Sequence, residues 1–216
     1  MVRQFPVLAD EEWPSEANLI LEEDAALELG HPSLGSLSFL CWTEAKRPEP
    51  DRILLLGPDL QEIKARRAPF AQILILHGGF QEEYECFQEL REAVYETRLR
   101  GFMTRVLPSR RTIWSRVTRE ALEQGFSLAH LGRALIRRLK EVEYVSGVRV
   151  LFITESPTEI AGLAGVGQEV SRIAGAMIKM NEEMSYDCAS CEFGDVCEKV
   201  LDLKKIREKL LERKSR

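Results

Sequence analysis

Long apolar runs are missing from this chain of 216 residues, and so is a basic start followed by an apolar stretch. No 18 apolar residues stand together, which excludes a membrane-spanning helix. The first twelve residues are acidic, so we expect no secretory signal and a cytoplasmic protein. With 44% hydrophobic and 30% charged residues, the chain has the composition of a folded globular protein and not of an intrinsically disordered one.

Familiar catalytic motifs are also absent. The sequence has no Walker A loop, no dinucleotide-binding fingerprint, no Gly-x-Ser-x-Gly elbow and no His-Glu-x-x-His pair. Its three histidines, His31, His77 and His130, are scattered. The sequence therefore names no catalytic residue, and we expect none of the nucleotide-loop or metalloprotease chemistries that these motifs support.

Cysteine is scarce and unevenly placed. The chain has five cysteines, an odd number, and three of them form the run Cys188-Ala-Ser-Cys191-Glu-Phe-Gly-Asp-Val-Cys197. This pattern does not suit a secreted disulfide framework. Two residues between the first two cysteines let both sulfurs reach one metal centre, and the third closes the cup. We therefore expect Cys188, Cys191 and Cys197 to be metal ligands.

Three thiolates leave one ligand position open, because structural zinc and a 4Fe-4S cluster each take four ligands. Candidates for the fourth are Cys41, Cys86, Asp187 or Asp195, a small molecule, or a residue of another subunit. We favour the 4Fe-4S cluster. A zinc site and three metal-free thiols are the alternatives.

Charge is strongly segregated, although the net charge is only -5. Residues 1–97 contain 8 Lys or Arg against 19 Asp or Glu, whereas residues 98–140 contain 11 basic residues, ten of them Arg, against two Glu. The basic segment is either a solvated face that pairs with the acidic half, or a site for phosphate or carboxylate groups. Nucleic acid is a weaker interpretation, because the whole chain is acidic.

The apolar periodicity predicts an α/β or α+β fold with a mixed sheet and flanking helices. Strands are expected at 18–22, 37–42, 52–56, 72–77, 112–118 and 148–154, and helices at 81–99, 127–140 and 157–183, the last loosened at its start by glycines. We expect two domains, an α/β domain at 1–183 and a segment at 184–216 that contains the cysteine cup and a C-terminal helix.

Several phrases together resemble the β subunit of the carbon monoxide dehydrogenase/acetyl-CoA synthase complex. They occur in the family's order and at similar spacing between about residues 20 and 197, and they are Leu27-Glu28-Leu29-Gly30, Ser33-Leu34-Gly35, Ile53-Leu54-Leu55-Leu56-Gly57-Pro58-Asp59-Leu60, Ile73-Leu74-Ile75-Leu76-His77-Gly78-Gly79, Ile113-Trp114-Ser115-Arg116-Val117-Thr118 and Val148-Arg149-Val150-Leu151-Phe152-Ile153-Thr154. The resemblance implies a truncated, divergent member that has the family's α/β middle domain.

The resemblance also bears on the metal and on the reaction. In that family the cysteine segment holds a 4Fe-4S cluster bridged to a dinickel site. In the sequence, Cys188 and Cys191 correspond to the family's first two cluster cysteines, and Cys197 corresponds to the third. The spacing before Cys197 is shorter than in the family, and no fourth cluster cysteine and no Cys-Gly-Cys nickel motif is present. We therefore expect the family's fold and cluster without complete synthase activity. The sequence leaves open whether the protein catalyses another reaction.

The family's middle domain is thought to hold CoA through arginines near a tryptophan. Trp114 with Arg110, Arg111 and Arg116 falls in the matching stretch, although core packing is the simpler explanation of Trp114. The expected role is an accessory, electron-transfer or metal-delivery component of anaerobic one-carbon metabolism. Its expected partners are components of the carbon monoxide dehydrogenase complex, corrinoid or ferredoxin-type proteins and CoA, and the oligomeric state is left open.

Two other functions fit parts of the sequence. The first is a non-enzymatic binding module whose cysteine cup holds zinc and pins the last helix. The second is a CRISPR-type exonuclease, which also ends in a cysteine run but needs an upstream Asp and a Glu-x-Lys for metal-dependent cleavage. Glu62-Ile63-Lys64 matches that pattern, but no strand is predicted to place it.

Overall fold

The structure is a computed structural model, and it describes residues 2–7, 12–31, 33–43, 50–80, 83–107 and 111–181. The chain divides into two compact units, Met1–Ala161 and Gly162–Arg216. The predicted boundary between residues 183 and 184 lies outside the described residues, so that division stays a prediction.

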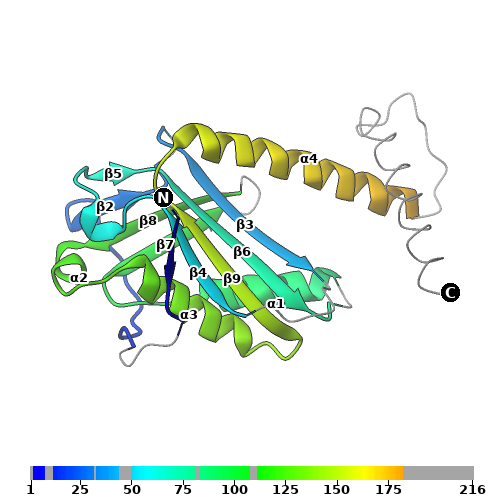
Figure 1. Ribbon diagram of the computed structural model, residues 1–216, viewed down its shortest axis with the longest axis horizontal. Helices are drawn as coiled ribbons and strands as arrows, with labels where there is room; N and C mark the ends of the chain where they lie inside the picture. Colours follow the sequence, from blue (N-terminus) through cyan, green and yellow to red (C-terminus); the bar gives the residue numbers. More distant parts are fainter. Residues whose placement is uncertain are drawn as a thin grey trace. The chain divides into compact units, whose positions relative to one another are not determined.

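Two mixed sheets form the first unit. One has five strands in the order β1-β4-β9-β6-β3 and the other has four in the order β5-β2-β8-β7 (Figure 1). The strands are β1 Val2–Phe5, β2 Ala25–Leu29, β3 Ser36–Thr43, β4 Arg52–Leu56, β5 Arg67–Ala68, β6 Phe70–Gly78, β7 Phe102–Leu107, β8 Thr112–Thr118 and β9 Val145–Ile153. Each sheet contains both parallel and antiparallel pairs. The predicted class is therefore confirmed, with two mixed sheets.

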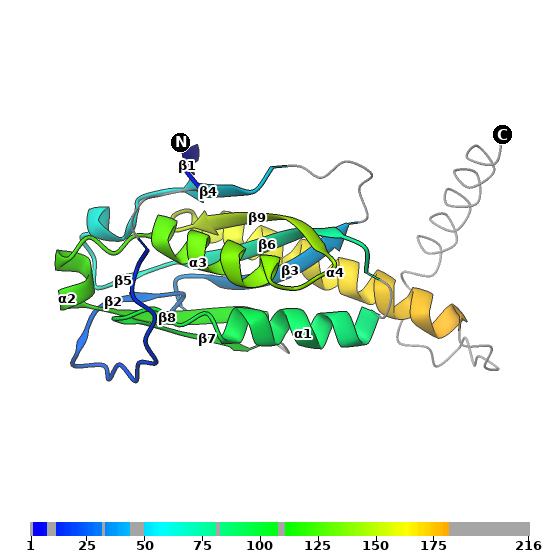
Figure 2. The same cartoon turned by 90° about the horizontal axis from the view of Figure 1, so that it is seen from below.

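The helices described are α1 Glu83–Tyr95, α2 Arg119–Glu123, α3 Leu128–Lys140 and α4 Pro157–Asn181, together with the short 3-10 helix η1 Leu60–Glu62. In Figure 2 the two sheets form separate layers, and α3 runs along β9 of the larger one. The helix predicted at 157–183 is a continuous α-helix despite its glycines. The predicted C-terminal helix and cysteine cup lie outside the described residues.

One hydrophobic core joins the two sheets to α1 and α3. The smaller sheet contributes Leu29 and Val117 and the larger sheet Phe152, and all three are completely buried. The predicted leucine stripe of α3 is part of the same core, and it consists of Leu128, Leu131, Leu135 and Leu139. The apolar residues of α3 repeat every three to four positions and those of the strands every two, and both sets of side chains therefore point into the same core.

Most predicted elements match, but the strand predicted at 18–22 is wrong. This stretch is irregular, with Leu19 exposed at 74% and Ile20 buried at 3%. The Asn18 side chain amide donates hydrogen bonds to the carbonyls of Leu99 (2.7 Å) and Glu16 (2.9 Å), which holds the segment against the start of β7. The neighbouring strand is β2, which begins at Ala25 and was not predicted because Glu28 interrupts its apolar pattern.

Candidate functional site

The predicted anion site centres on β8, which exposes one face of the smaller sheet. Burial alternates along this strand: Ile113, Ser115 and Val117 point into the core, so Trp114 and Arg116 share the opposite face. The guanidinium carbon of Arg116 lies 4.4 Å from the centre of the Trp114 ring. The structure therefore brings two of the predicted residues into direct contact, in a cation–π arrangement.

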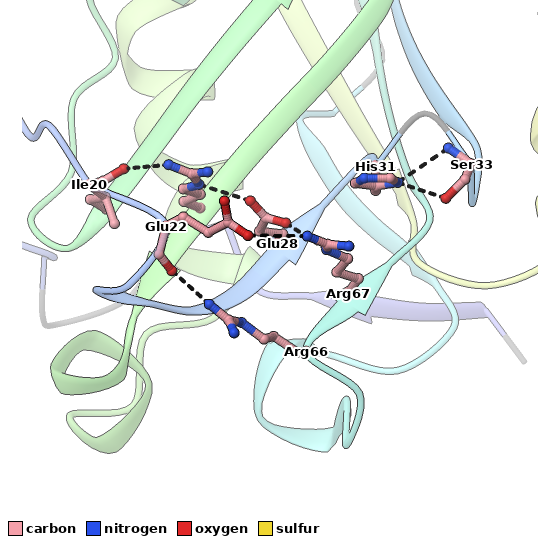
Figure 3. Close-up of polar contacts among 8 residues, drawn as sticks. Ile20, Glu22, Glu28, His31, Ser33, Arg66 and Arg67 are labelled. Atoms are coloured by element: carbon pink, nitrogen blue, oxygen red, sulfur yellow. Dashed lines mark hydrogen bonds and ion pairs between the residues drawn. The ribbon is translucent and has the colours of Figure 1, made fainter.

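Arg116 is held in place by a buried carboxylate on β2. Its Nε donates to Glu28 Oε1 at 2.9 Å. From β5, Arg67 Nε donates to Glu28 Oε2 at 2.9 Å (Figure 3). Glu28 is only 3% exposed. The three residues form a row across β5, β2 and β8, because Glu28 is the register partner of both arginines. We call Glu28, Arg67 and Arg116 the Glu28 cluster.

Two opposing effects set the pKa of Glu28. Burial alone would raise it, but the hydrogen bonds and positive charges of Arg116 and Arg67 outweigh the burial and hold the pKa below its ordinary value. Glu28 is therefore an anion at neutral pH. This carboxylate and its two cations form a charge-assisted network that ties three strands together.

Arg116 has little freedom to bind a ligand. Besides Glu28 it donates from Nη1 to the carbonyl of Ile20 at 3.0 Å, and its side chain is 15% exposed. Trp114 is half-buried and packs against the small cluster of Ile20, Ala25 and Met103. These contacts hold the Arg116 guanidinium over the Trp114 ring and use part of its hydrogen-bonding capacity.

The other two predicted arginines precede β8. Arg111 lies in the turn directly before the strand at a φ of 50°, and its carbonyl accepts a hydrogen bond of 2.7 Å from the backbone amide of Ser38 on β3. Arg110 lies outside the described residues. Arg105 on β7, which sequence reasoning did not assign to the site, is the register partner of Trp114 and is exposed.

Of the predicted metal ligands, the structure describes only the two candidates in the body. Cys86 on α1 is 7% exposed within the core, as predicted for a core thiol, and Cys41 on β3 is exposed. The run Cys188, Cys191 and Cys197 and the oxygen candidates Asp187 and Asp195 lie outside the described residues. Within the described ranges, no group of three or more His, Cys, Asp or Glu side chains could hold a metal ion.

Much of the basic segment pairs with the acidic half of the chain. Arg137 pairs with Glu12, Arg138 with Glu96 and Lys140 with Asp51, in addition to the pair between Arg116 and Glu28. The first of the two interpretations of this segment is therefore correct for these four cations. Most of the pairs are exposed and contribute little stability, whereas Glu28 is buried.

Sequence reasoning missed Glu28 and Arg67 as members of this site. The signal was one acid within an otherwise apolar strand, Ala-Ala-Leu-Glu-Leu, because a buried carboxylate needs a cation close by.

Glu62, the acid of the nuclease hypothesis, completes the capping box of η1 and pairs with Arg3. Among the described residues, no helix is long and apolar enough to cross a membrane.

Comparisons with known proteins agree with the resemblance in the sequence. The chain is similar to the acetyl-CoA decarbonylase/synthase complex subunit beta of Methanopyrus kandleri, with 32% identity over 145 residues, which cover 65% of this chain and 30% of the relative. The subunit beta of Archaeoglobus fulgidus is 27% identical over 144 residues, covering 65% and 27%. Subunit beta 1 of Methanosarcina mazei is 24% identical over 184 residues, covering 82% and 39%.

This chain thus spans 27% to 39% of the length of these relatives. A family model described as the CO dehydrogenase/acetyl-CoA synthase complex beta subunit matches residues 14–158, which contain both sheets except β1, as well as α1 to α3. Because this match covers well over half of the sequence, the chain belongs to the family of the CO dehydrogenase/acetyl-CoA synthase complex beta subunit.

Proposed function

We propose that this protein is an acetyl-CoA synthase-like iron–sulfur protein of anaerobic one-carbon and CO metabolism, with an accessory, electron-transfer or metal-delivery role. The observation that carries the proposal is the family match over residues 14–158, because these residues build the two-sheet body. The relatives are subunits of an acetyl-CoA decarbonylase/synthase complex. Components of such a complex, including corrinoid or ferredoxin-type proteins, are therefore the proposed partners.

The proposal assigns a 4Fe-4S cluster to Cys188, Cys191 and Cys197. Their chemistry fits, since thiolates are the usual ligands of such clusters. Cys86 is a poor fourth ligand, because it would have to leave a core position that is 7% exposed. Cys41 is exposed and needs no such rearrangement. An open iron at the fourth position would allow ligand binding or redox work at the cluster.

Metal and acid-labile sulfide analysis of protein purified without oxygen tests this assignment. About four iron and four sulfide per chain, with an electron paramagnetic resonance signal after reduction, supports the cluster. Cys191→Ser should abolish the bound metal, and Cys41→Ser separately tests whether Cys41 is the fourth ligand. One zinc without sulfide would favour the alternative, a binding module stabilised by zinc. Metal content unchanged by Cys191→Ser would refute the ligand assignment.

We further propose that the face around Trp114 binds CoA, with its phosphates held by Arg110 and Arg111. Arg116 then acts indirectly, because its contacts with Glu28 and Ile20 hold it over the Trp114 ring. Arginine suits this task because its guanidinium group binds phosphate through two hydrogen bonds.

Calorimetry of CoA binding tests this second proposal. The double variant Arg110→Ala and Arg111→Ala should weaken binding about tenfold or more. The matched control is Arg91→Ala on α1, whose guanidinium lies over Phe87. If the unmodified protein shows no affinity for CoA, the CoA proposal is wrong, whereas the cluster assignment would stand.

A further inference from the structure

A cavity of about 290 Å³ lies between α3 and the N-terminal part of the chain. Its walls come from Val7, Glu12 and Trp13, from Asp51 and Leu99, and from one face of α3 that includes Arg133 and Arg137. None of its lining residues belongs to the Glu28 cluster, to the surroundings of Trp114 or to the cysteine run. The volume suits a small molecule.

One wall of the cavity is apolar and rigid. The indole Nε1 of Trp13 donates to the carbonyl of Arg100 at 2.8 Å, and the Trp13 ring packs 5.1 Å from the ring of Phe126 and 5.0 Å from that of His130. Leu99 and Ile136, which line the same space, are 1% and 4% exposed. This wall is therefore formed before any ligand arrives, which lowers the entropic cost of binding.

Both carboxylates at the cavity already have partners. Glu12 pairs with Arg137. Asp51 accepts a hydrogen bond of 2.8 Å from the backbone amide of Val148, and its other oxygen lies 3.9 Å from Lys140 Nζ. Neither carboxylate pairs with the remaining cation of the cavity, Arg133.

Arg133 is half-buried, and no carboxylate of the described residues forms an ion pair with it. Its one hydrogen bond there is long, 3.5 Å from Nη1 to the carbonyl of Pro6. Burial lowers the pKa of Arg133, because partial removal from water disfavours the charged form. A guanidinium group has five N–H donors, so the described residues use only a small part of the capacity of Arg133.

We propose that this cavity binds a small organic anion, whose carboxylate or phosphate group pairs with Arg133 while its apolar part packs against Trp13, Leu99 and Ile136. The ligand supplies the counter-ion that the described residues do not place beside Arg133. A charge-assisted, two-pronged contact with the guanidinium provides recognition, and the apolar wall provides contact area. This inference is independent of the proposed cluster and of CoA binding at Trp114.

Calorimetry of the full chain with benzoate, phenyl phosphate and the neutral analogue benzamide tests the proposal. Benzoate or phenyl phosphate should bind, and benzamide should bind at least about tenfold more weakly, because it lacks the charge. Arg133→Gln should reduce anion binding by a similar factor. The matched control is Arg138→Gln on the same helix, where the arginine pairs with Glu96 and Glu141 outside the cavity.

A gain-of-function variant protects the test against misfolding. Glu12→Gln removes the partner of Arg137, which also lines the cavity, so this variant should bind both anions more tightly than the unmodified protein. A folding defect cannot produce that result. Absence of anion binding at millimolar concentration, equal binding of benzamide, or unchanged affinity in Arg133→Gln would each overturn the proposal.

Discussion

At the scale of single residues, the most informative side chain is Glu28. It is a 3%-exposed carboxylate in the middle of the smaller sheet, and it satisfies two arginines from two neighbouring strands. Burying one charge would be prohibitive, but burying it between two hydrogen-bonded cations is tolerated. The cost of this arrangement appears when one member is removed, because the remaining charges are then left without a partner.

Glu28→Gln should therefore destabilise the protein by about 2 kcal/mol, somewhat less than a fully buried pair because Arg67 is 45% exposed. Urea unfolding followed by circular dichroism measures the change. Glu62→Gln is the control, since Glu62 also accepts an arginine hydrogen bond but lies at the surface, and its loss should change the midpoint little. Equal midpoints for the two variants would contradict the structural role of Glu28.

The same carboxylate predicts a pH dependence. The pKa of Glu28 is lower in the folded protein than in the unfolded chain, where it is about 4.3. Below pH 5 the unfolded chain takes up this proton first, so the stabilisation by Glu28 is complete above the unfolded pKa and is lost as the pH falls through the folded pKa.

Gln cannot titrate, so the gap in unfolding free energy between the unmodified protein and Glu28→Gln should narrow between pH 5 and pH 3. Urea titrations at both pH values give the two gaps. Exposed acids such as Glu62 and Glu120 also have lowered pKa values, but they are present in both proteins and cancel in the comparison. A gap that stays constant would mean that the pKa of Glu28 is the same in the folded and the unfolded protein, which would contradict its pairing with the two arginines.

At the scale of elements, α3 shows how one helix serves two purposes. Its leucine stripe fills the core, and Arg133 and Arg137, on another face, line the cavity. Gly132 lets the helix approach β4 closely: a Cβ atom at this position would lie 2.7 Å from Ile53 Cγ2. The glycine is therefore required by packing, even though alanine is the better helix former.

Gly132→Ala should destabilise the protein by about 1–3 kcal/mol, because overpacking against Ile53 outweighs the gain in helix propensity. Thermal unfolding measures the effect. Gly162→Ala on α4 is the matched control: no described atom lies within 4 Å of the added Cβ, so the midpoint should stay or rise. A stabilised Gly132→Ala variant would show that α3 and β4 are less tightly packed than described.

At the scale of the whole molecule, the core that joins the two sheets is built from residues of the first unit. The three cysteines proposed as cluster ligands, Cys188, Cys191 and Cys197, lie in the second unit, beyond residue 161. We therefore expect folding of the body to depend on buried apolar surface and not on metal coordination, in contrast to small metal-dependent domains.

Removal of the metal should therefore leave the body folded. The main thermal transition of protein treated with a chelator, or exposed to oxygen, should shift by less than about 2 °C relative to the metal-loaded form. The near-ultraviolet circular dichroism of the buried aromatic residues, which include Phe126 and Phe152, reports on the body directly. Loss of that signal together with the metal would show that the cluster holds the body together.

Sequence alone determined the features that depend on local periodicity. The strands at 52–56 and 112–118, the leucine stripe of α3 and the core position of Cys86 follow from spacing, because each residue's face is set by the repeat of its own element. The family resemblance was likewise carried by ordered phrases along the chain.

Contacts between residues distant in the sequence were decided only by the tertiary structure. The irregular path of residues 18–22 depends on bonds from Asn18 to the carbonyls of Leu99 and Phe102, and the Glu28 cluster joins residues up to 88 positions apart. The register of the smaller sheet places Arg116 beside Glu28. The packing of α3, in contrast, places Arg133 at the edge of a cavity. A sequence lists charges, but only the packing of strands and helices determines which of them find a partner.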